Sequence, residues 1–186
     1  MMYGYSKHLV DLWMQKEGAW KQGAVGLKYF NVFGPNEYHK GRMASMVLKM
    51  TELAQKDGFV RLYKSNDPAR FADGEQVRDF IYLKDAVKMT CALLLPPFKT
   101  IGGIFNIGLG QPTSWNTMAK ALFRGLNREA HIQYISMPLE LSRQYQNYTC
   151  ADMTKFHKML PGFSARPASI CVAEYVQEYL LMQARW

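Results

Sequence analysis

Two side chains near the start of the sequence have the types and spacing that proton transfer requires. Tyr3 and Lys7 are four positions apart, which places both on one face of a helix. A nearby ammonium group favours the phenolate and lowers the pKa of a tyrosine, so that the tyrosine can accept a proton near neutral pH. The same spacing is common between ordinary surface residues, and for this pair alone both interpretations stay open.

Two later segments place a polar side chain within or beside an apolar run. Asn31 interrupts an apolar segment, where an amide needs hydrogen-bonding partners. At the carboxyl end of a parallel strand it would face a ligand crevice; capping a turn is the alternative. Arg78 precedes another apolar run, where its guanidinium can bind a diphosphate through two parallel hydrogen bonds. A surface salt bridge with Asp79 or Glu75 is the alternative.

The elements that must position these residues alternate between helices and strands. The pattern predicts helices over 3–20, 42–56, 85–95, 114–126 and 152–160 and from Pro167 onward, strands over 24–32, 59–63, 77–83, 104–107 and 132–135, and a loop over 65–76. This alternation predicts an α/β fold. The first helix is amphipathic, with Leu9, Leu12, Trp13 and Met14 near one face. We expect the segment 24–32 to be a buried parallel strand.

Composition excludes several functional classes. The 186 residues correspond to one domain or to a domain plus a fragment, and 48% hydrophobic residues support a packed core. No apolar run approaches the roughly 20 residues of a membrane helix, and we find no secretory signal.

The net charge of +8 comes from dispersed basic residues, so we expect neither a nucleic-acid nor a membrane partner. Three widely spaced cysteines argue against disulfides and metal sites and favour the cytoplasm.

Taken together, the motifs resemble those of the extended short-chain dehydrogenase/reductase family, and in particular its nucleotide-sugar epimerases and dehydratases. Family members carry Tyr-x-x-x-Lys, then Arg-x-x-Asn-Val-Tyr-Gly-Pro, then Arg-Asp-Phe-Val-Tyr-Val-x-Asp. This chain carries Tyr3 and Lys7, then KYFNVFGP at 28–35, then RDFIYLKD at 78–85, in the same order. Lys28 and Phe33 replace the usual arginine and tyrosine.

Three further segments resemble the heptose 6-epimerases within this family. They are YHKGRMAS at 38–45, GIFNIGLG at 103–110, and the segment 138–149, which contains Arg143, Tyr145 and Gln146. The likeness extends over almost the whole chain. The segment GLG at 108–110 lacks the third glycine of a cofactor-binding loop, so we do not interpret it as one.

The resemblance implies an incomplete Rossmann-type fold. Residues 1–36 would be the last helix and strand of a truncated dinucleotide-binding domain. Residues 37–186 would form the substrate-binding region, with some segments returning to the Rossmann domain. In the family, the glycine-rich turn that binds the dinucleotide precedes the tyrosine. Only two residues precede Tyr3, so we expect an N-terminally truncated form in which the strand 24–32 has an uncovered edge.

The resemblance also implies a role for individual residues. In heptose 6-epimerases, NADP mediates oxidation and re-reduction at C6″ of an ADP-heptose, and inversion needs a proton donor or acceptor on each face of the sugar. Tyr3 and Lys40 correspond to these two groups, and Lys7 would hold the nicotinamide ribose. Cofactor contacts would come from Lys7, Val32 and Lys40, and substrate contacts from Asn31, Arg42, Lys49, Tyr63, Asn66, Arg78 and Tyr145. Arg42 and Lys49 replace a serine and a histidine of the family pattern.

Several alternatives stay open at this point. The chain resembles UDP-sugar 4-epimerases and sugar dehydratases less closely; the 4-epimerases invert with one tyrosine and a rotating sugar, so Lys40 distinguishes them. A second alternative is an inactive remnant that binds a nucleotide sugar, or a partner that completes the fold in trans. NAD is the alternative cofactor to NADP. The full-length family implies a homo-oligomer.

We expect the purified chain to bind NADP weakly or not at all and to show little or no epimerase activity, because its motifs include no glycine-rich turn for the pyrophosphate. The measurements are the nucleotide absorbance of the purified chain and its turnover of ADP-heptose. Stoichiometric NADP together with turnover would contradict this expectation.

Overall fold

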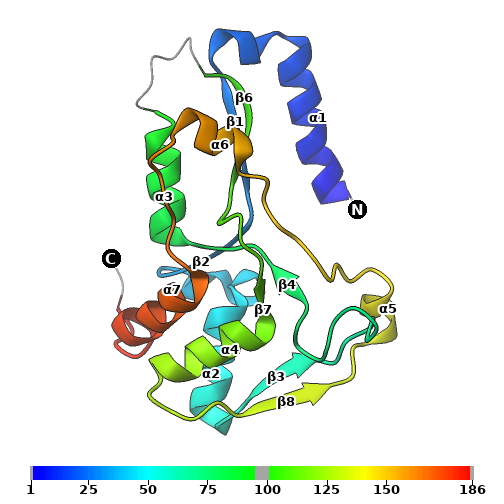
Figure 1. The fold of residues 1–186 in the computed structure, drawn as a ribbon, viewed down its shortest axis with the longest axis vertical. Helices are drawn as coiled ribbons and strands as arrows, with labels where there is room; N and C mark the ends of the chain where they lie inside the picture. Colours follow the sequence, from blue (N-terminus) through cyan, green and yellow to red (C-terminus); the bar gives the residue numbers. More distant parts are fainter. Residues whose placement is uncertain (1, 95–100, 185–186) are drawn as a thin grey trace.

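The computed structural model describes residues 2–94 and 101–184, which form an α/β fold (Figure 1). The α-helices are α1 (Met2–Lys16), α2 (Met46–Asp57), α3 (Leu83–Ala92), α4 (Trp115–Gly125), α5 (Leu139–Ser142), α6 (Thr154–Met159) and α7 (Ala168–Tyr175). The strands are β1 (Val25–Tyr29), β2 (Asn31–Phe33), β3 (Val60–Tyr63), β4 (Val77–Arg78), β5 (Phe80–Tyr82), β6 (Gly103–Ile107), β7 (Thr113–Ser114) and β8 (Ile132–Ile135). Two 3₁₀ helices, η1 (Ala19–Gln22) and η2 (Tyr38–Met43), and a π-helix, η3 (Val176–Leu180), complete the regular structure.

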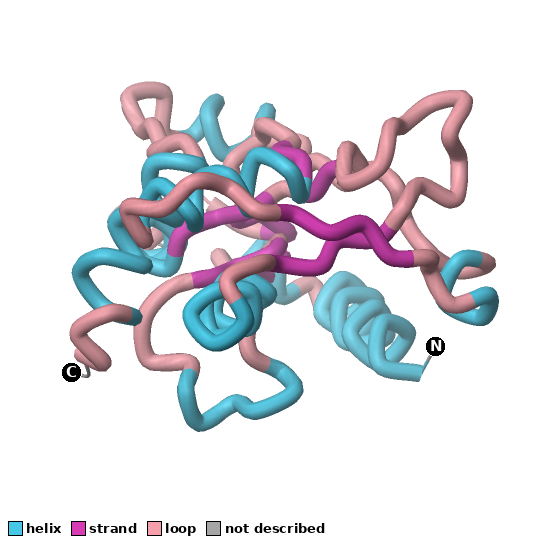
Figure 2. The backbone as a smooth tube through the Cα atoms, turned by 90° about the horizontal axis from the view of Figure 1, so that it is seen from below, coloured by secondary structure: helices cyan, strands magenta, loops and turns pink. Residues whose placement is uncertain are grey.

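The strands associate as pairs. β1 pairs with β6, β2 with β5, and β3 with β8, all in parallel, whereas β4 and β7 are antiparallel. In Figure 2 the strands run through the middle of the molecule, with helices and loops around them. The parallel pairs confirm the predicted α/β class. In the described part of the chain β6 is the single neighbour of β1, so the other edge of β1 is uncovered, as predicted.

The predicted strand over 24–32 is wrong in two respects. It divides into β1 and β2, because the Phe30 amide donates to the Ile107 carbonyl of β6 while the Asn31 amide donates to the Asp79 carbonyl. The chain thus leaves β6 after Tyr29 and joins β5. The segment is also only partly buried, and Tyr29 is 50% exposed. Because β1 has a strand neighbour on one edge only, it is less buried than a central strand of a parallel sheet.

Two hydrophobic clusters form the core. The upper cluster of Figure 1 packs α3 and α6 against the β1–β6 pair through Met89, Phe105 and Phe156. The lower cluster joins α2, α4 and α7 with β3 and β5. Within it, α4 and α7 approach closely at Gly125, where a Cβ atom would lie 3.1 Å from the Cα of Ala173. A larger side chain at this position would push the two helices apart.

Helix boundaries differ from the predictions where local hydrogen bonds decide them. The first helix ends at Lys16 instead of continuing to residue 20, because Gly18 adopts a left-handed conformation with φ 69°. The helix predicted over 42–56 begins at Met46, because Ser45 is its N-cap and accepts a hydrogen bond from the Leu48 amide. The residues before Ser45 form η2 instead.

The apolar face predicted for the first helix does not become part of the core. No residue of α1 is buried, and Leu9, Leu12 and Trp13 are each about half exposed. An ion pair between Asp11 and Lys28 joins α1 to β1. In Figure 1, α1 lies beside the β1–β6 pair, away from α2, α4 and β8.

The extended segment predicted over 77–83 divides into β4, which pairs with β7, and β5, which pairs with β2. The other predicted elements agree with the structure to within about two residues. Ser114 caps α4 by accepting from the Thr117 amide, and α7 begins directly after Pro167. The predicted helix over 85–95 is α3, which begins at Leu83; Leu95 lies outside the described residues. The three cysteines are free, as predicted.

Asp79 joins three segments that are distant in the sequence. Its carboxylate is fully buried and accepts hydrogen bonds from the backbone amides of Leu109, Gly110 and Ala151, at 2.6, 2.8 and 2.9 Å. A buried carboxylate is stable only when such donors replace its hydration. Gly108 permits the close approach, because a Cβ atom there would lie 3.0 Å from the carboxylate. The salt bridge with Arg78 that we considered as an alternative does not form.

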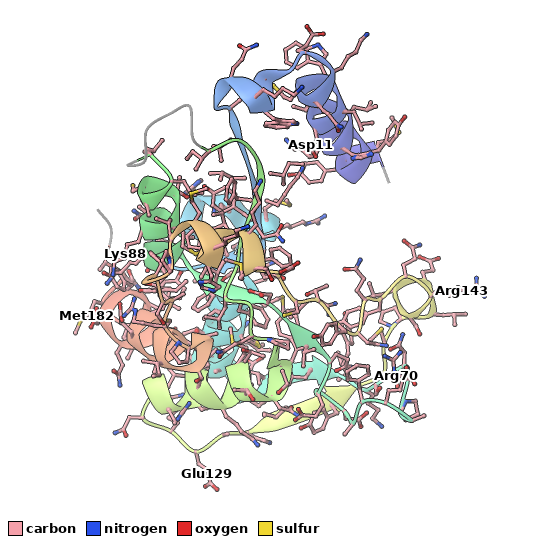
Figure 3. The ribbon with its side chains drawn as sticks, turned by 45° about the horizontal axis from the view of Figure 1, so that its top comes forward. Asp11, Arg70, Lys88, Glu129, Arg143 and Met182 are labelled. Atoms are coloured by element: carbon pink, nitrogen blue, oxygen red, sulfur yellow. The ribbon has the colours of Figure 1, made fainter. Side chains whose placement is uncertain are left out.

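We expect Asp79→Asn to lower the free energy of unfolding by about 3 kcal/mol, because an amide presents one acceptor oxygen and a clashing NH₂ group to three amide donors. Denaturation with urea measures the change. Glu129→Gln is the control, since Glu129 is exposed before β8 (Figure 3) and should change stability by less than about 0.5 kcal/mol. Equal stabilities of the two variants would contradict the role assigned to Asp79.

Candidate functional site

Three of the predicted site residues line one cavity of about 270 Å³. Asn31 and Val32 reach it from β2, and Lys40 reaches it from η2. We call this the Lys40 cavity, and its other lining residues are Phe33, Glu37, Met43, Ala44, Ser45, Met46, Val47, Phe80 and Trp115. The cavity therefore lies between β2, the first residue of β5 and the start of α2. Asn31 is the first residue of β2 and not at a carboxyl strand end as predicted.

A second cavity of about 280 Å³ adjoins the first. It contains two predicted substrate-binding residues, Tyr63 at the end of β3 and Tyr145 after α5. We call it the Tyr145 cavity, and its other lining residues are Met46, Arg61, Leu62, Gln76, Trp115 and Ile135. Met46 and Trp115 line both cavities, so the two volumes share a wall. An elongated ligand with two chemically different halves matches this arrangement.

Trp115 is held firmly in the shared wall. Its indole N–H donates to the Tyr145 hydroxyl at 3.0 Å, and its ring packs edge-on against Phe80 with centroids 5.0 Å apart. Both contacts leave the indole little rotational freedom. Trp115 is not among the site residues predicted from the sequence. The sequence shows that it directly follows the helix cap Ser114, but only the packing shows that it lines the two cavities.

Arg78 lies beside the Tyr145 cavity without a carboxylate partner in the described part of the chain. Its guanidinium stacks over the Tyr145 ring, 4.8 Å from the centroid, and donates one hydrogen bond to the Val77 carbonyl. Burial lowers the pKa of Arg78 below its usual value, yet a guanidinium stays protonated at neutral pH. A half-buried, uncompensated positive charge is suited to an anionic ligand.

Lys40 lies on a tight turn whose conformation requires glycine. Gly41 adopts φ 49° and ψ −118° within η2, a region that side chains with a Cβ atom rarely occupy. The Lys40 amide donates to the Glu37 carbonyl at 3.0 Å, and the side chain of Lys40 is exposed. The turn thus places Lys40 at the cavity that Asn31 also lines.

Besides Arg78, which lies beside the Tyr145 cavity, five predicted site residues line neither cavity. Tyr3 is 78% exposed on α1, and the Lys7 ammonium lies 5.4 Å from the centroid of its ring. The two share a helical face, as predicted, but the structure does not bring them to Lys40. Figure 3 shows α1, marked by Asp11, apart from the lower elements.

The other three of these residues take part in hydrogen bonds within the protein. The Lys49 ammonium donates to the Arg42 carbonyl at 2.7 Å, so both residues hold the turn before α2. The Asn66 amide donates to the Ser142 carbonyl at 2.8 Å and joins the long loop to α5. For these positions, where the sequence departs from the family pattern, the structure shows intramolecular contacts in place of exposure to the cavities.

The described residues do not form a dinucleotide-binding site by themselves. The loop at 108–110 resembles such a site superficially, but the amides of Leu109 and Gly110 are occupied by the Asp79 carboxylate. Phosphate binding needs such amides to be available. Of the three predicted cofactor contacts, Val32 and Lys40 share one cavity, while Lys7 lies on exposed α1.

Other site classes find no support in the part of the chain that the structure describes. Residues 2–94 and 101–184 contain no group of three histidine, cysteine or acidic side chains arranged to hold a metal ion. Over the same residues, no helix combines the length and apolar character that crossing a membrane demands.

Comparison with curated sequences shows close relatives. The profile of the NAD dependent epimerase/dehydratase family matches residues 1–108. An ADP-L-glycero-D-manno-heptose-6-epimerase from Nitratidesulfovibrio vulgaris is 44% identical over 179 residues, which cover 96% of this chain and 54% of the relative. The chain spans about half the length of the curated relatives it matches.

Solved structures show the same fold. The ADP-L-glycero-D-manno-heptose-6-epimerase of Helicobacter pylori superimposes with a TM-score of 0.75 at 26% identity, over 96% of this chain and 51% of that chain. A UDP-glucose-4-epimerase from Stenotrophomonas maltophila, solved with NAD and formylated UDP-arabinopyranose, gives 0.75 at 18% identity, over 97% and 55%. The profile match over more than half of the chain and the 44% identity show that the chain belongs to the NAD dependent epimerase/dehydratase family.

Proposed function

We propose that this chain carries the nucleotide-sugar-binding part of an ADP-glyceromanno-heptose 6-epimerase. One observation carries the proposal: Lys40 and Asn31 line one cavity, and this cavity adjoins a second one that contains Tyr63 and Tyr145. Arg78, which has no ion-pair partner in the described residues, stacks on Tyr145. A sugar, a diphosphate and a base each bind through different chemical groups. Asn31 and Lys40 supply polar groups for the sugar, Arg78 a positive charge for the diphosphate, and Tyr63 and Tyr145 aromatic rings for the base.

Each part of the ligand has a chemical counterpart. A sugar in the Lys40 cavity would meet an amide from Asn31 and an ammonium from Lys40. The diphosphate would accept parallel hydrogen bonds from Arg78. The largely aromatic and aliphatic Tyr145 cavity, with Tyr63 and Trp115 in its walls, suits the face of a purine. The relatives, which are ADP-heptose epimerases, support ADP as the nucleotide.

Lys40 is the group that separates the heptose 6-epimerases from the 4-epimerases. Inversion by oxidation and re-reduction at C6″ needs a proton donor or acceptor on each face of the reacting carbon, and we assign these roles to Lys40 and Tyr3. A lysine accepts a proton only as the neutral amine, so the ammonium group must first lose a proton within the cavity. The whole enzyme would bring α1 and the Lys40 cavity to the same sugar.

We further propose NADP as the cofactor, a homo-oligomeric state, and a cytoplasmic location. The three free cysteines agree with a cytoplasmic location.

A second candidate function is the binding of a nucleotide sugar without catalysis. The position of Tyr3 favours it, because this tyrosine is exposed on α1 while both cavities are already formed without it. Affinity without turnover would distinguish this function from that of an epimerase.

We expect Arg78→Ala to weaken the binding of ADP by roughly 10- to 100-fold, because charge-assisted hydrogen bonds to the diphosphate are lost. Arg78→Lys should give an intermediate loss, since an ammonium cannot form the paired contacts of a guanidinium. Titration calorimetry with ADP measures these affinities. Arg124→Ala, an exposed position at the end of α4, is the matched control. An unchanged affinity in Arg78→Ala would exclude Arg78 from the site.

We expect Lys40→Ala to slow inversion at C6″ by roughly 10²- to 10⁴-fold, the usual contribution of a positioned acid or base. The assay uses a full-length enzyme in which this chain replaces the matching segment of the Nitratidesulfovibrio vulgaris relative. ADP affinity should stay unchanged, since Lys40 lines the sugar cavity alone. Lys56→Ala is the control, because Lys56 is exposed in the last turn of α2 and lines neither cavity. Full epimerisation by Lys40→Ala would instead favour a one-tyrosine mechanism.

A further inference from the structure

Glu37 is a buried carboxylate in the wall of the Lys40 cavity. It is 4% exposed and accepts hydrogen bonds from three donors. One oxygen accepts from the Ser45 amide at 2.7 Å, and the other accepts from the Ser45 hydroxyl and from the Tyr175 hydroxyl, the latter at 2.9 Å. A carboxylate removed from water needs all of these donors. We call these three residues the Glu37 clasp.

The clasp holds both ends of the turn that carries Lys40. Glu37 directly precedes η2, and Ser45 follows it as the N-cap of α2. Between these two positions, the Lys40 amide donates to the Glu37 carbonyl and the Ala44 amide to the Gly41 carbonyl. The two contacts between Glu37 and Ser45 therefore close the turn into a loop of fixed span.

Tyr175 connects the clasp to the helix at the other side of the core. This tyrosine of α7 is fully buried and packs against Phe33 and Tyr82, with ring centroids 6.4 and 6.5 Å apart. Burial, and next to it the charge of Glu37, raises the pKa of Tyr175, so its hydroxyl remains a donor over the whole physiological range. A parallel contact joins the Tyr38 hydroxyl to the Tyr179 carbonyl of η3 at 3.2 Å.

We propose that Glu37 and Tyr175 are positioning residues for Lys40. The ammonium belongs to an exposed side chain on a six-residue 3₁₀ segment, and its place at the cavity depends on where the clasp holds that segment. The proposal rests on the proposed function, because it assigns the clasp to the sugar half of the ligand. Glu37 does not itself take part in proton transfer, since its oxygens are occupied by Ser45 and Tyr175.

Hydrogen exchange of single amides, measured by NMR on the full chain, tests the geometric half of the proposal. Tyr175→Phe removes one hydroxyl from the clasp and keeps the buried ring. The amides of Lys40, Ala44 and Ser45 should then exchange about tenfold faster, as expected for one lost bond to a carboxylate. Glu37→Ala should give a larger increase.

The matched control is Tyr82→Phe. Tyr82 packs beside Tyr175 and is equally buried, but its hydroxyl makes no hydrogen bond to Glu37. This variant should leave the three amides unchanged. The amides of Leu122 and Phe123 in the core of α4 report on global unfolding. Unchanged exchange at Lys40, Ala44 and Ser45 in Tyr175→Phe would overturn the proposal. An equal acceleration in the core of α4 would also overturn it, because the effect would then be global.

Ligand affinity tests the functional half. The probes are ADP and ADP-heptose, and the quantity is the ratio of their dissociation constants by calorimetry. In the unmodified chain ADP-heptose should bind more tightly; in Glu37→Ala the ratio should approach one while ADP affinity changes less than about twofold. A loss shared equally by both probes would indicate a purely structural role and would overturn the proposal. If the unmodified chain binds neither probe, the proposed function fails, and the exchange experiment still decides whether the clasp holds the Lys40 turn.

Discussion

The hydrogen bonds around the Asp79 carboxylate are the constraint on which the candidate site depends. By accepting three backbone amides, Asp79 fixes the junction of β4 and β5 to the loop after β6 and to the segment at Ala151. Neighbouring side chains in an extended segment point to opposite sides. With Asp79 directed inward, Arg78 stacks on Tyr145 and Phe80 packs on Trp115. One buried carboxylate thereby directs the guanidinium and the aromatic wall to the cavities.

A second buried carboxylate, Glu37, has the same physical role at the other side of the site. Both acids are saturated with hydrogen bonds, so their charges are compensated inside the protein. Lys40 and Arg78 differ, because no carboxylate forms an ion pair with either in the described residues. The local positive charge suited to an anionic ligand therefore comes from two specific side chains and their surroundings. The net charge of +8 is a poor guide to this local arrangement.

The helix α1 has a different relation to the rest of the molecule. Its apolar side chains are exposed, and an ion pair to Lys28 and contacts with η1 join it to the core. Tyr3 and Lys7 consequently form a local pair whose alignment follows from helical geometry alone. The substrate-binding cavities, by contrast, consist of residues from β2, η2, α2, β3 and α4, which packing has brought together.

Local patterns in the sequence determined the α/β class, most element positions and the caps of α4 and α7, because periodicity and capping act over a few residues. They also singled out Asn31 and Arg78 as polar side chains within or beside apolar runs, whereas Lys40 and Tyr145 were predicted from the resemblance to a known family. Tertiary structure alone decided two matters: the change of partner after Tyr29 and the shared wall formed by Trp115. Each depends on a hydrogen bond or contact between segments distant in the chain. A one-dimensional pattern contains no information about which distant amide or hydroxyl will meet Asp79, Glu37 or Tyr145, and only the packed core brings them together.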